Sequence, residues 1–158
     1  MLKIEAAFAS GESQNALRVA NELLAKVNSM APNQDAGPED LHDVRIRALS
    51  SRGLAHLDLG KFLDAKIDLT EVTRMSPRSS AAMVNLAKVS VAEQDNAAAF
   101  DLYEKALMLD AQNFDAISGI VTSSIRMQQT ANAHSRIEDL IAANAGRADV
   151  VEALRYLN

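Results

Sequence analysis

The sequence predicts an all-α fold, an α-α superhelix (solenoid) of stacked antiparallel helical hairpins. The first observation is composition, because 28 of the 158 residues are Ala while only six are Gly and three are Pro, and this balance favours helix. The second is a spacing of 34 residues that recurs along the chain. The third is that apolar residues recur at helical intervals in both halves of each 34-residue stretch, as in amphipathic helices.

The repeat is clearest in a column of small residues. Ala65, Ala99 and Ala133 follow one another at intervals of 34 residues. Shortly before each Ala the apolar pattern breaks, which predicts the turn of a hairpin. The expected turn positions are Gly60, Gln94 and Gln128. A single hairpin cannot bury its own apolar face, so neighbouring hairpins are expected to stack.

The N-terminal part of the chain is less regular. We expect residues 1–28 to form a partial hairpin with Gly11 as its turn, because residues 11–28 repeat the pattern of a second arm. Residues 29–43 are dense in Pro, Gly, Asn and Asp, which predicts an inserted loop. Pro38 within this segment is expected in the first turn of a lengthened helix, where its missing N–H costs nothing.

Three repeat units and a short tail follow. The units span residues 46–79, 80–113 and 114–147. The third is degenerate, because Val121 stands in a column that is otherwise small. Residues 148–158 are expected to form a capping helix or the first arm of a further repeat. Either interpretation would cover the apolar side chains near the end, which are Leu154, Tyr156 and Leu157.

The order of small and large residues in these units resembles the tetratricopeptide repeat (TPR) family. The residues that carry the resemblance are Gly53, Gly60, Ala65 and Pro77 in the first unit and Leu86, Ala87, Ala99, Tyr103 and Ala106 in the second. Arg52 departs from the family pattern, which has an apolar residue there, and the chain contains no Trp. The resemblance implies a superhelix whose first arms line a concave groove for a peptide or helix of a partner protein.

The resemblance also implies which side chains line that groove. They are Arg47, Ser50, Ser51, Leu54 and Asp58, then Ala81, Val84, Asn85, Lys88 and Ala92, then Asp115, Ser118, Gly119, Thr122 and Arg126. TPR domains that hold the C-terminal carboxylate of cytosolic chaperones use a clamp of Lys, Asn and Arg side chains. The matching positions in this sequence hold Ser50, Leu54, Asn85, Asp115 and Gly119. Only Asn85 fits the clamp, and Asp115 has the wrong charge for binding a carboxylate, so chaperone docking by that mode is not expected.

Catalytic and metal chemistry is not expected from the motifs. The chain has no Cys, which excludes thiolate metal sites and Cys nucleophiles. His42, His56 and His134 fall in three separate predicted elements and form no ligand pair at helical spacing. His56 is interpreted as a packed or hydrogen-bonded structural residue. No glycine-rich phosphate loop or nucleophile motif occurs, so we expect no enzyme activity, no metal and no cofactor.

Charge is unevenly distributed along the chain. The formal net charge of −5 argues against a nucleic-acid-binding role, which needs clustered positive charge. Residues 45–79 nevertheless hold seven basic side chains against four acidic ones. They either contact an acidic peptide or a phosphate or form a solvated helix surface. The basic residues are Arg45, Arg47, Arg52, Lys61, Lys66, Arg74 and Arg78.

The sequence therefore favours a non-catalytic protein–protein interaction module with a protein or peptide partner. Two alternatives stay open. The first is a structural segment of a longer TPR array that stacks or self-associates through its terminal helices, and the second is a regulatory region of a larger enzyme. No apolar stretch is long enough for a membrane span and no signal peptide is visible, so a soluble protein is expected, with no indication of its compartment.

Overall fold

The computed structural model describes residues 2–29 and 38–127, together with isolated positions between 134 and 151. Within these residues every regular element is a helix, which confirms the all-α prediction. The chain divides into two compact units, Met1–Pro77 and Arg78–Asn158, and each is described by itself. Several sequence predictions lie outside the described residues, namely those for Gln128, Ala133, Leu154, Tyr156 and Leu157.

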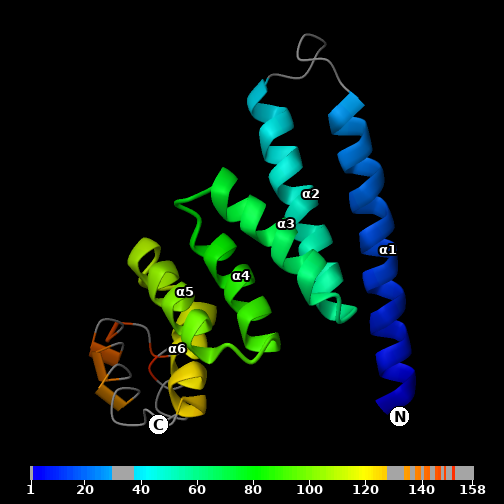
Figure 1. Ribbon diagram of the computed structural model, residues 1–158. Helices are drawn as coiled ribbons and strands as arrows, with labels where there is room; N and C mark the ends of the chain where they lie inside the picture. The colour runs from blue at the N-terminus through cyan, green and yellow to red at the C-terminus, as the bar shows by residue number, and fades with distance from the viewer. Residues whose placement is uncertain are drawn as a thin grey trace. The chain divides into compact units, whose positions relative to one another are not determined.

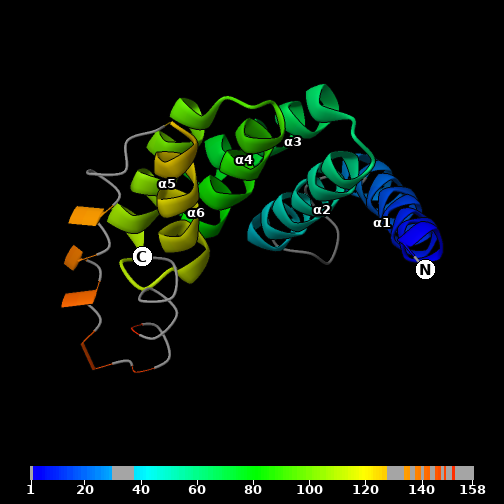
Figure 2. The same ribbon diagram turned by 90° about the horizontal axis from the view of Figure 1, so that it is seen from below.

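Unit 1 (Met1–Pro77) contains α1 (Leu2–Ser29), α2 (Pro38–Asp58) and α3 (Phe62–Met75). α2 packs against both α1 and α3 (Figures 1 and 2). α2 begins at Pro38, as the sequence predicts. The turn between α2 and α3 contains Gly60 with a φ of 71°, a left-handed conformation that Gly adopts without steric cost. The predicted turn at Gly60 is therefore confirmed.

The turn predicted at Gly11 is wrong. α1 runs without a break over Leu2–Ser29, and Gly11 lies inside it, so the described part of residues 1–28 is a single helix and not a partial hairpin. A Gly in a helix interior costs only about 1 kcal/mol relative to Ala. That penalty is too small to end a helix whose neighbouring residues favour helix and which packs along α2.

The core of unit 1 depends on close approach between α2 and α3. Ala65 and Leu69 of α3 are completely buried. At Gly53 of α2, an added Cβ atom would lie 2.6 Å from Cγ of Leu69, which is far inside van der Waals contact. A side chain at position 53 would collide with Leu69, so this position requires Gly. This requirement agrees with the prediction that Gly53 belongs to a column of small residues.

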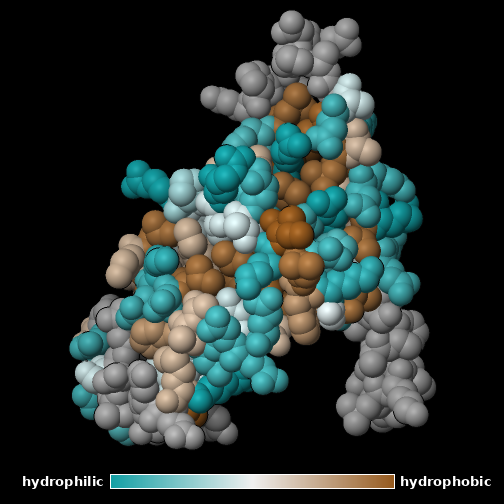
Figure 3. Space-filling model, viewed as in Figure 1, coloured by the Kyte–Doolittle hydropathy of each residue, from teal (hydrophilic) through white to brown (hydrophobic). Residues whose placement is uncertain are grey.

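α3 also carries apolar side chains that unit 1 leaves in solvent. The side chains of Leu63 and Ile67 are 72 % and 60 % exposed, and their spacing of four residues places them on one face of the helix. Figure 3 shows apolar surface over α3, bordered by hydrophilic side chains.

Unit 2 (Arg78–Asn158) contains α4 (Ser80–Ala92), α5 (Asn96–Leu109) and α6 (Phe114–Arg126). α5 packs against both α4 and α6 (Figures 1 and 2). The α4–α5 turn contains Gln94 with a φ of 64°, so the turn predicted there is confirmed. The core of the unit includes Ala87 and Ala99, which are completely buried as expected for the small columns.

The helices α4, α5 and α6 each start at a side-chain cap. The side chains of Ser79, Asp95 and Asn113 accept hydrogen bonds from the backbone N–H groups three residues later, at 3.2, 3.0 and 3.0 Å. Such caps satisfy N–H groups that have no partner within the helix. Asn113 has a second role, because its Nδ2 donates to Oγ of Ser80, which in turn donates to the carbonyl of Ala106. This chain of bonds joins the starts of α4 and α6 to the end of α5.

No helix in the described ranges combines the length and the apolar character needed to cross a membrane.

Candidate functional site

Unit 2 contains a hollow of about 250 Å³ between α4 and α6, which we call the α4–α6 hollow. Side chains from α4 and α6 form its walls, and α5 contributes to its floor. Its lining residues are Lys88, Val91, Tyr103, Phe114, Asp115, Ser118, Gly119 and Thr122. Five of the residues expected to line a groove are brought together here by the structure, namely Lys88, Asp115, Ser118, Gly119 and Thr122.

An ion pair crosses the mouth of the hollow. Nζ of Lys88 on α4 lies 2.9 Å from Oδ2 of Asp115 on α6, and the two side chains are 43 % and 60 % exposed. An ion pair this exposed contributes at most about 1 kcal/mol to stability. Its main consequence is electrostatic, because the positive and negative charges at the mouth cancel each other.

The floor of the hollow is the aromatic ring of Tyr103. Only 5 % of Tyr103 is exposed, and its ring lies directly against the backbone of Gly119, where an added Cβ would overlap the ring atoms. Burial raises the pKa of the Tyr103 phenol above its ordinary value, the carboxylate of Asp115 raises it further, and Arg126 opposes both effects. The phenol is therefore uncharged near neutral pH and presents a proton rather than a negative charge.

The walls combine apolar groups with hydroxyls. Val91 and Phe114 line the hollow, and Phe114 is 43 % exposed. The hydroxyl of Thr122 donates to the backbone carbonyl of Ser118 at 2.9 Å, so its proton is already used within α6. Sequence reasoning did not place Val91, Tyr103 or Phe114 at a site. Phe114 could have been suspected from the sequence, because it is an aromatic residue at the start of the first arm of the third repeat unit.

One predicted groove residue of α4 is misplaced. Val84 is 3 % exposed and belongs to the hydrophobic core, so it cannot contribute to a groove surface. The reason is its position three residues before Ala87, which puts both on one face of α4, and this face packs into the unit. The remaining predicted residues of unit 2 outside the hollow are partly or fully exposed, namely Ala81, Asn85, Ala92 and Arg126.

The groove residues predicted for the first repeat lie on α2 of unit 1. Arg47, Ser51 and Asp58 are exposed, and Ser50 and Leu54 are half-buried. Oδ2 of Asp58 accepts a hydrogen bond from Ser13 of α1 at 3.2 Å. These residues belong to unit 1, whereas the α4–α6 hollow belongs to unit 2.

Several basic residues of unit 1 form hydrogen bonds with other side chains of the unit. Arg74 forms two hydrogen bonds with Glu71, at 2.7 and 2.6 Å, and these bonds lower the pKa of Glu71. Arg45 donates to Oδ1 of Asn28 at 2.9 Å. Arg45, Glu71 and Arg74 border a second hollow, of about 540 Å³, in unit 1. The internal partners favour the interpretation of this basic segment as a solvated helix surface.

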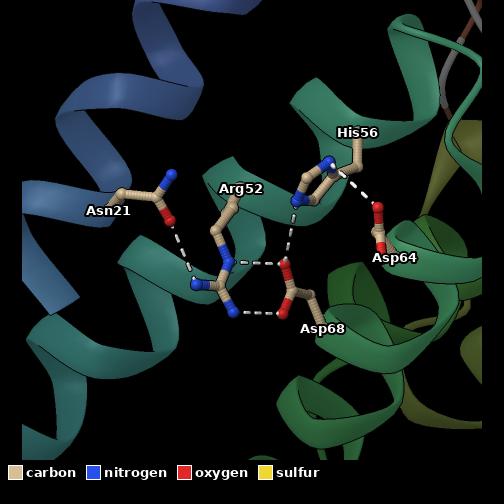
Figure 4. A network of polar contacts seen from close by, with 5 residues as sticks. All are labelled: Asn21, Arg52, His56, Asp64 and Asp68. Atoms are coloured by element: carbon tan, nitrogen blue, oxygen red, sulfur yellow. Dashed lines mark hydrogen bonds and ion pairs between the residues drawn. The ribbon is translucent and has the colours of Figure 1, made fainter.

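A polar network joins the three helices of unit 1 (Figure 4). Nε and Nη2 of Arg52 donate to the two carboxylate oxygens of Asp68, at 2.7 and 2.6 Å, and Nη1 donates to Asn21 of α1 at 3.1 Å. The hydrogen bond to Asp68 raises the pKa of Arg52. Arg52, which departs from the TPR pattern, is thus matched by a buried carboxylate on α3.

His56 lies beside this network. Its Nε2 is 4.0 Å from Asp68 and its Nδ1 is 4.0 Å from Asp64 (Figure 4). The side chain is only 14 % exposed, as its interpretation as a structural residue requires. Across the described parts of the chain, no three His, Asp or Glu side chains converge closely enough to hold a metal ion.

No protein-family model matches the sequence, and no curated protein matches it as a relative. Solved structures do resemble it. The crystal structure of MamA matches with a TM-score of 0.66 at 19 % identity and covers 93 % of this chain and 77 % of that chain. The first TPR of Spaghetti (RPAP3), bound to the HSP90 peptide SRMEEVD, matches with a TM-score of 0.59 at 18 % identity and covers 72 % and 92 %.

The TPR domain of Arabidopsis OM64 is similar as well, with a TM-score of 0.58 at 14 % identity, and covers 72 % of this chain and 93 % of that chain. At these identities the similarity concerns the fold. The likeness agrees with the repeat columns in the sequence and with the α2–α3 and α4–α5 hairpins. The chain therefore has a TPR-like fold of paired antiparallel helices.

Proposed function

We propose that the chain is a non-catalytic protein-interaction module, and that it binds a peptide or helix of a partner protein at the α4–α6 hollow. The observation that supports this most directly is the hollow itself, which Lys88 of α4 and Ser118 and Thr122 of α6 line together with Tyr103 of α5. Helical-repeat proteins bind partners on surfaces formed by successive repeats. A protein of similar fold, the first TPR of Spaghetti, has been solved with a bound peptide.

The chemistry of the hollow supports binding over catalysis. General acid–base catalysis needs a group that can exchange a proton near neutral pH. The ionisable groups of the lining are Lys88, Tyr103 and Asp115. Lys88 and Asp115 neutralise each other, and Tyr103 is held in its protonated form. A volume of about 250 Å³ is also below the roughly 300–1,000 Å³ of ordinary small-molecule pockets.

The proposed contact surface extends beyond the hollow. On unit 2 it includes Asn85 and Ala92 of α4 and Arg126 of α6, which are partly or fully exposed. The groove residues expected on α2 would form a separate contact surface of unit 1, and they are Arg47, Ser50, Ser51, Leu54 and Asp58. Val84 is not included, because it is buried.

Affinity capture from a native lysate, followed by mass spectrometry, tests this function. Ser118→Arg fills the hollow with a long side chain, and the combination Asn85→Ala with Lys88→Glu alters its rim without adding bulk. The matched control is Lys105→Glu, at an exposed position of α5. We expect a partner that the control retains and both hollow variants lose, with unchanged helix content by circular dichroism. A partner retained by the hollow variants would place the binding site elsewhere.

A second candidate function is assembly with other copies or other proteins through an apolar surface. Leu63 and Ile67 lie on one face of α3 and are 72 % and 60 % exposed, and contiguous exposed apolar surface often marks an association site. Light scattering across a range of protein concentrations tests it. A mass that rises with concentration in the unmodified chain, and does not rise in Leu63→Glu with Ile67→Glu, would support assembly. A constant monomer mass would exclude assembly with other copies.

A further inference from the structure

We infer that the α4–α6 hollow accepts an uncharged, bulky apolar side chain of the partner segment, and not an acidic side chain or a C-terminal carboxylate. This inference rests on the proposed function, because it names the chemistry of the ligand at the same hollow.

The charges at the mouth disfavour an anionic ligand. Among the lining residues that the structure describes, Lys88 is the only cation, and its Nζ is already 2.9 Å from the carboxylate of Asp115. A ligand carboxylate near Lys88 would have to displace Asp115 or lie beside it, and two carboxylates in close contact repel each other. An uncharged side chain meets neither obstacle, because it can pass between charges that already cancel.

The interior of the hollow favours apolar contact. The ring of Tyr103 forms the floor, and Gly119 has no side chain that would cover it. Phe114 lines the hollow and is 43 % exposed, so a ligand could bury a further part of its ring. Burial of apolar surface contributes about 25 cal/mol for each Å² removed from water. The raised pKa of Tyr103 keeps the floor uncharged near neutral pH.

The polar groups of the hollow do not call for a charged ligand either. The Thr122 hydroxyl already donates to the carbonyl of Ser118 at 2.9 Å. The volume of about 250 Å³ corresponds to roughly eight water molecules at about 30 Å³ each. That space suits a single bulky side chain, in the way that a helix or extended peptide places anchor side chains into pockets.

The test is selection of a displayed library of random short peptides on the purified full chain, with the Ser118→Arg variant for counter-selection. We expect the enriched peptides to share a bulky apolar residue at one position. In a synthetic copy of an enriched peptide, changing that residue to Glu should weaken binding at least about tenfold, or about 1.4 kcal/mol. Raising the salt concentration should change the affinity less than about twofold, because apolar contacts are not screened.

Two protein variants sharpen the result. Phe114→Ala should weaken binding of the enriched peptide by about tenfold, since exposed aromatic side chains that become buried are frequent hot spots. Lys105→Glu on α5 should leave its affinity unchanged. Both variants should keep the helix content and thermal midpoint of the parent within the ordinary range of surface substitutions.

The possible failures are distinguishable. If the enriched peptides share an acidic residue, or if amidation of their C-terminus abolishes binding, the hollow binds carboxylates and the inference is overturned while the proposed function stands. If no peptide binds the parent chain better than the Ser118→Arg variant, the proposed function fails at this hollow and the inference fails with it.

Discussion

The ring of Tyr103 on α5 lies against the backbone of Gly119 on α6 so closely that a Cβ atom at position 119 would overlap the ring. Tyr103 is almost completely buried, and the same ring forms the floor of the α4–α6 hollow. One contact therefore determines both how α5 and α6 pack and which surface the hollow presents. Changes at either residue should affect stability in ways that can be measured without knowing the ligand.

Gly119→Ala should destabilise the chain by about 1–3 kcal/mol. The new methyl group has no space, so either the ring or the backbone of α6 must move, which is the usual effect of overpacking a core. The measurement is urea unfolding followed by circular dichroism. Gly11→Ala is the matched control, because an added Cβ there meets no atom within 4 Å and Ala favours helix over Gly by about 1 kcal/mol. Equal losses in both variants would contradict the contact.

The phenol of Tyr103 should make stability fall at alkaline pH. Its pKa is raised in the folded state by burial, so above the ordinary Tyr value of about 10 the unfolded chain loses the proton more readily than the folded chain does. The stabilisation is complete below that pH and is lost as the pH rises through the folded pKa. Tyr103→Phe removes this dependence.

The measurement compares the urea midpoints of the parent chain and Tyr103→Phe at about pH 8 and about pH 10.5. All other ionisable groups are the same in both proteins, so the difference between them reports Tyr103. We expect the parent chain to lose more stability than the variant between the two pH values. Parallel losses would mean that the phenol ionises as easily in the folded chain as in the unfolded one.

Replacing Arg52 alone should destabilise the chain strongly, whereas replacing both Arg52 and Asp68 with apolar residues should destabilise it little. Asp68 is 3 % exposed, and Arg52→Met would leave its carboxylate buried without its two strongest hydrogen bonds, at a cost of about 3 kcal/mol. Adding Asp68→Leu removes the unpaired charge and should recover most of that loss. Thermal unfolding of both variants checks this. No recovery in the double variant would show that the pair contributes more than mutual neutralisation.

The helical hairpins were predictable because local residues determine them. Gly60 and Gln94 lie in the turns, and the small columns of Ala65 and Ala99 are completely buried. Gly11 was misread for the opposite reason. A lone Gly changes helix stability only slightly, so the packing of α1 along α2 decides whether the helix continues. The residues next to Gly11 do not indicate this contact between helices.

The site was predictable only in part. Ser118 and Thr122 share a face of α6 because they are four residues apart, and Lys88 of α4 stands at the equivalent position 34 residues before Thr122. Val84 was placed wrongly, since α4 has apolar residues on most sides and their pattern does not show which face is buried. The role of Tyr103 depends on Gly119 of the next helix having no side chain, a contact between helices that the repeat columns of the sequence do not reveal.

The two hairpin turns allow a matched prediction, because equivalent positions hold different residues. Gly60 has a φ of 71° and Gln94 a φ of 64°, and a residue with a side chain pays about 1–2 kcal/mol in this left-handed conformation. Gly60→Ala should therefore destabilise unit 1 by about 1 kcal/mol, although no atom blocks the new methyl group. Gln94→Gly should stabilise unit 2 by up to about 1 kcal/mol, less the extra flexibility of Gly in the unfolded chain. Urea unfolding measures both changes. Shifts of the same sign in the two variants would show that the side chains, and not the backbone conformation, determine the stability of these turns.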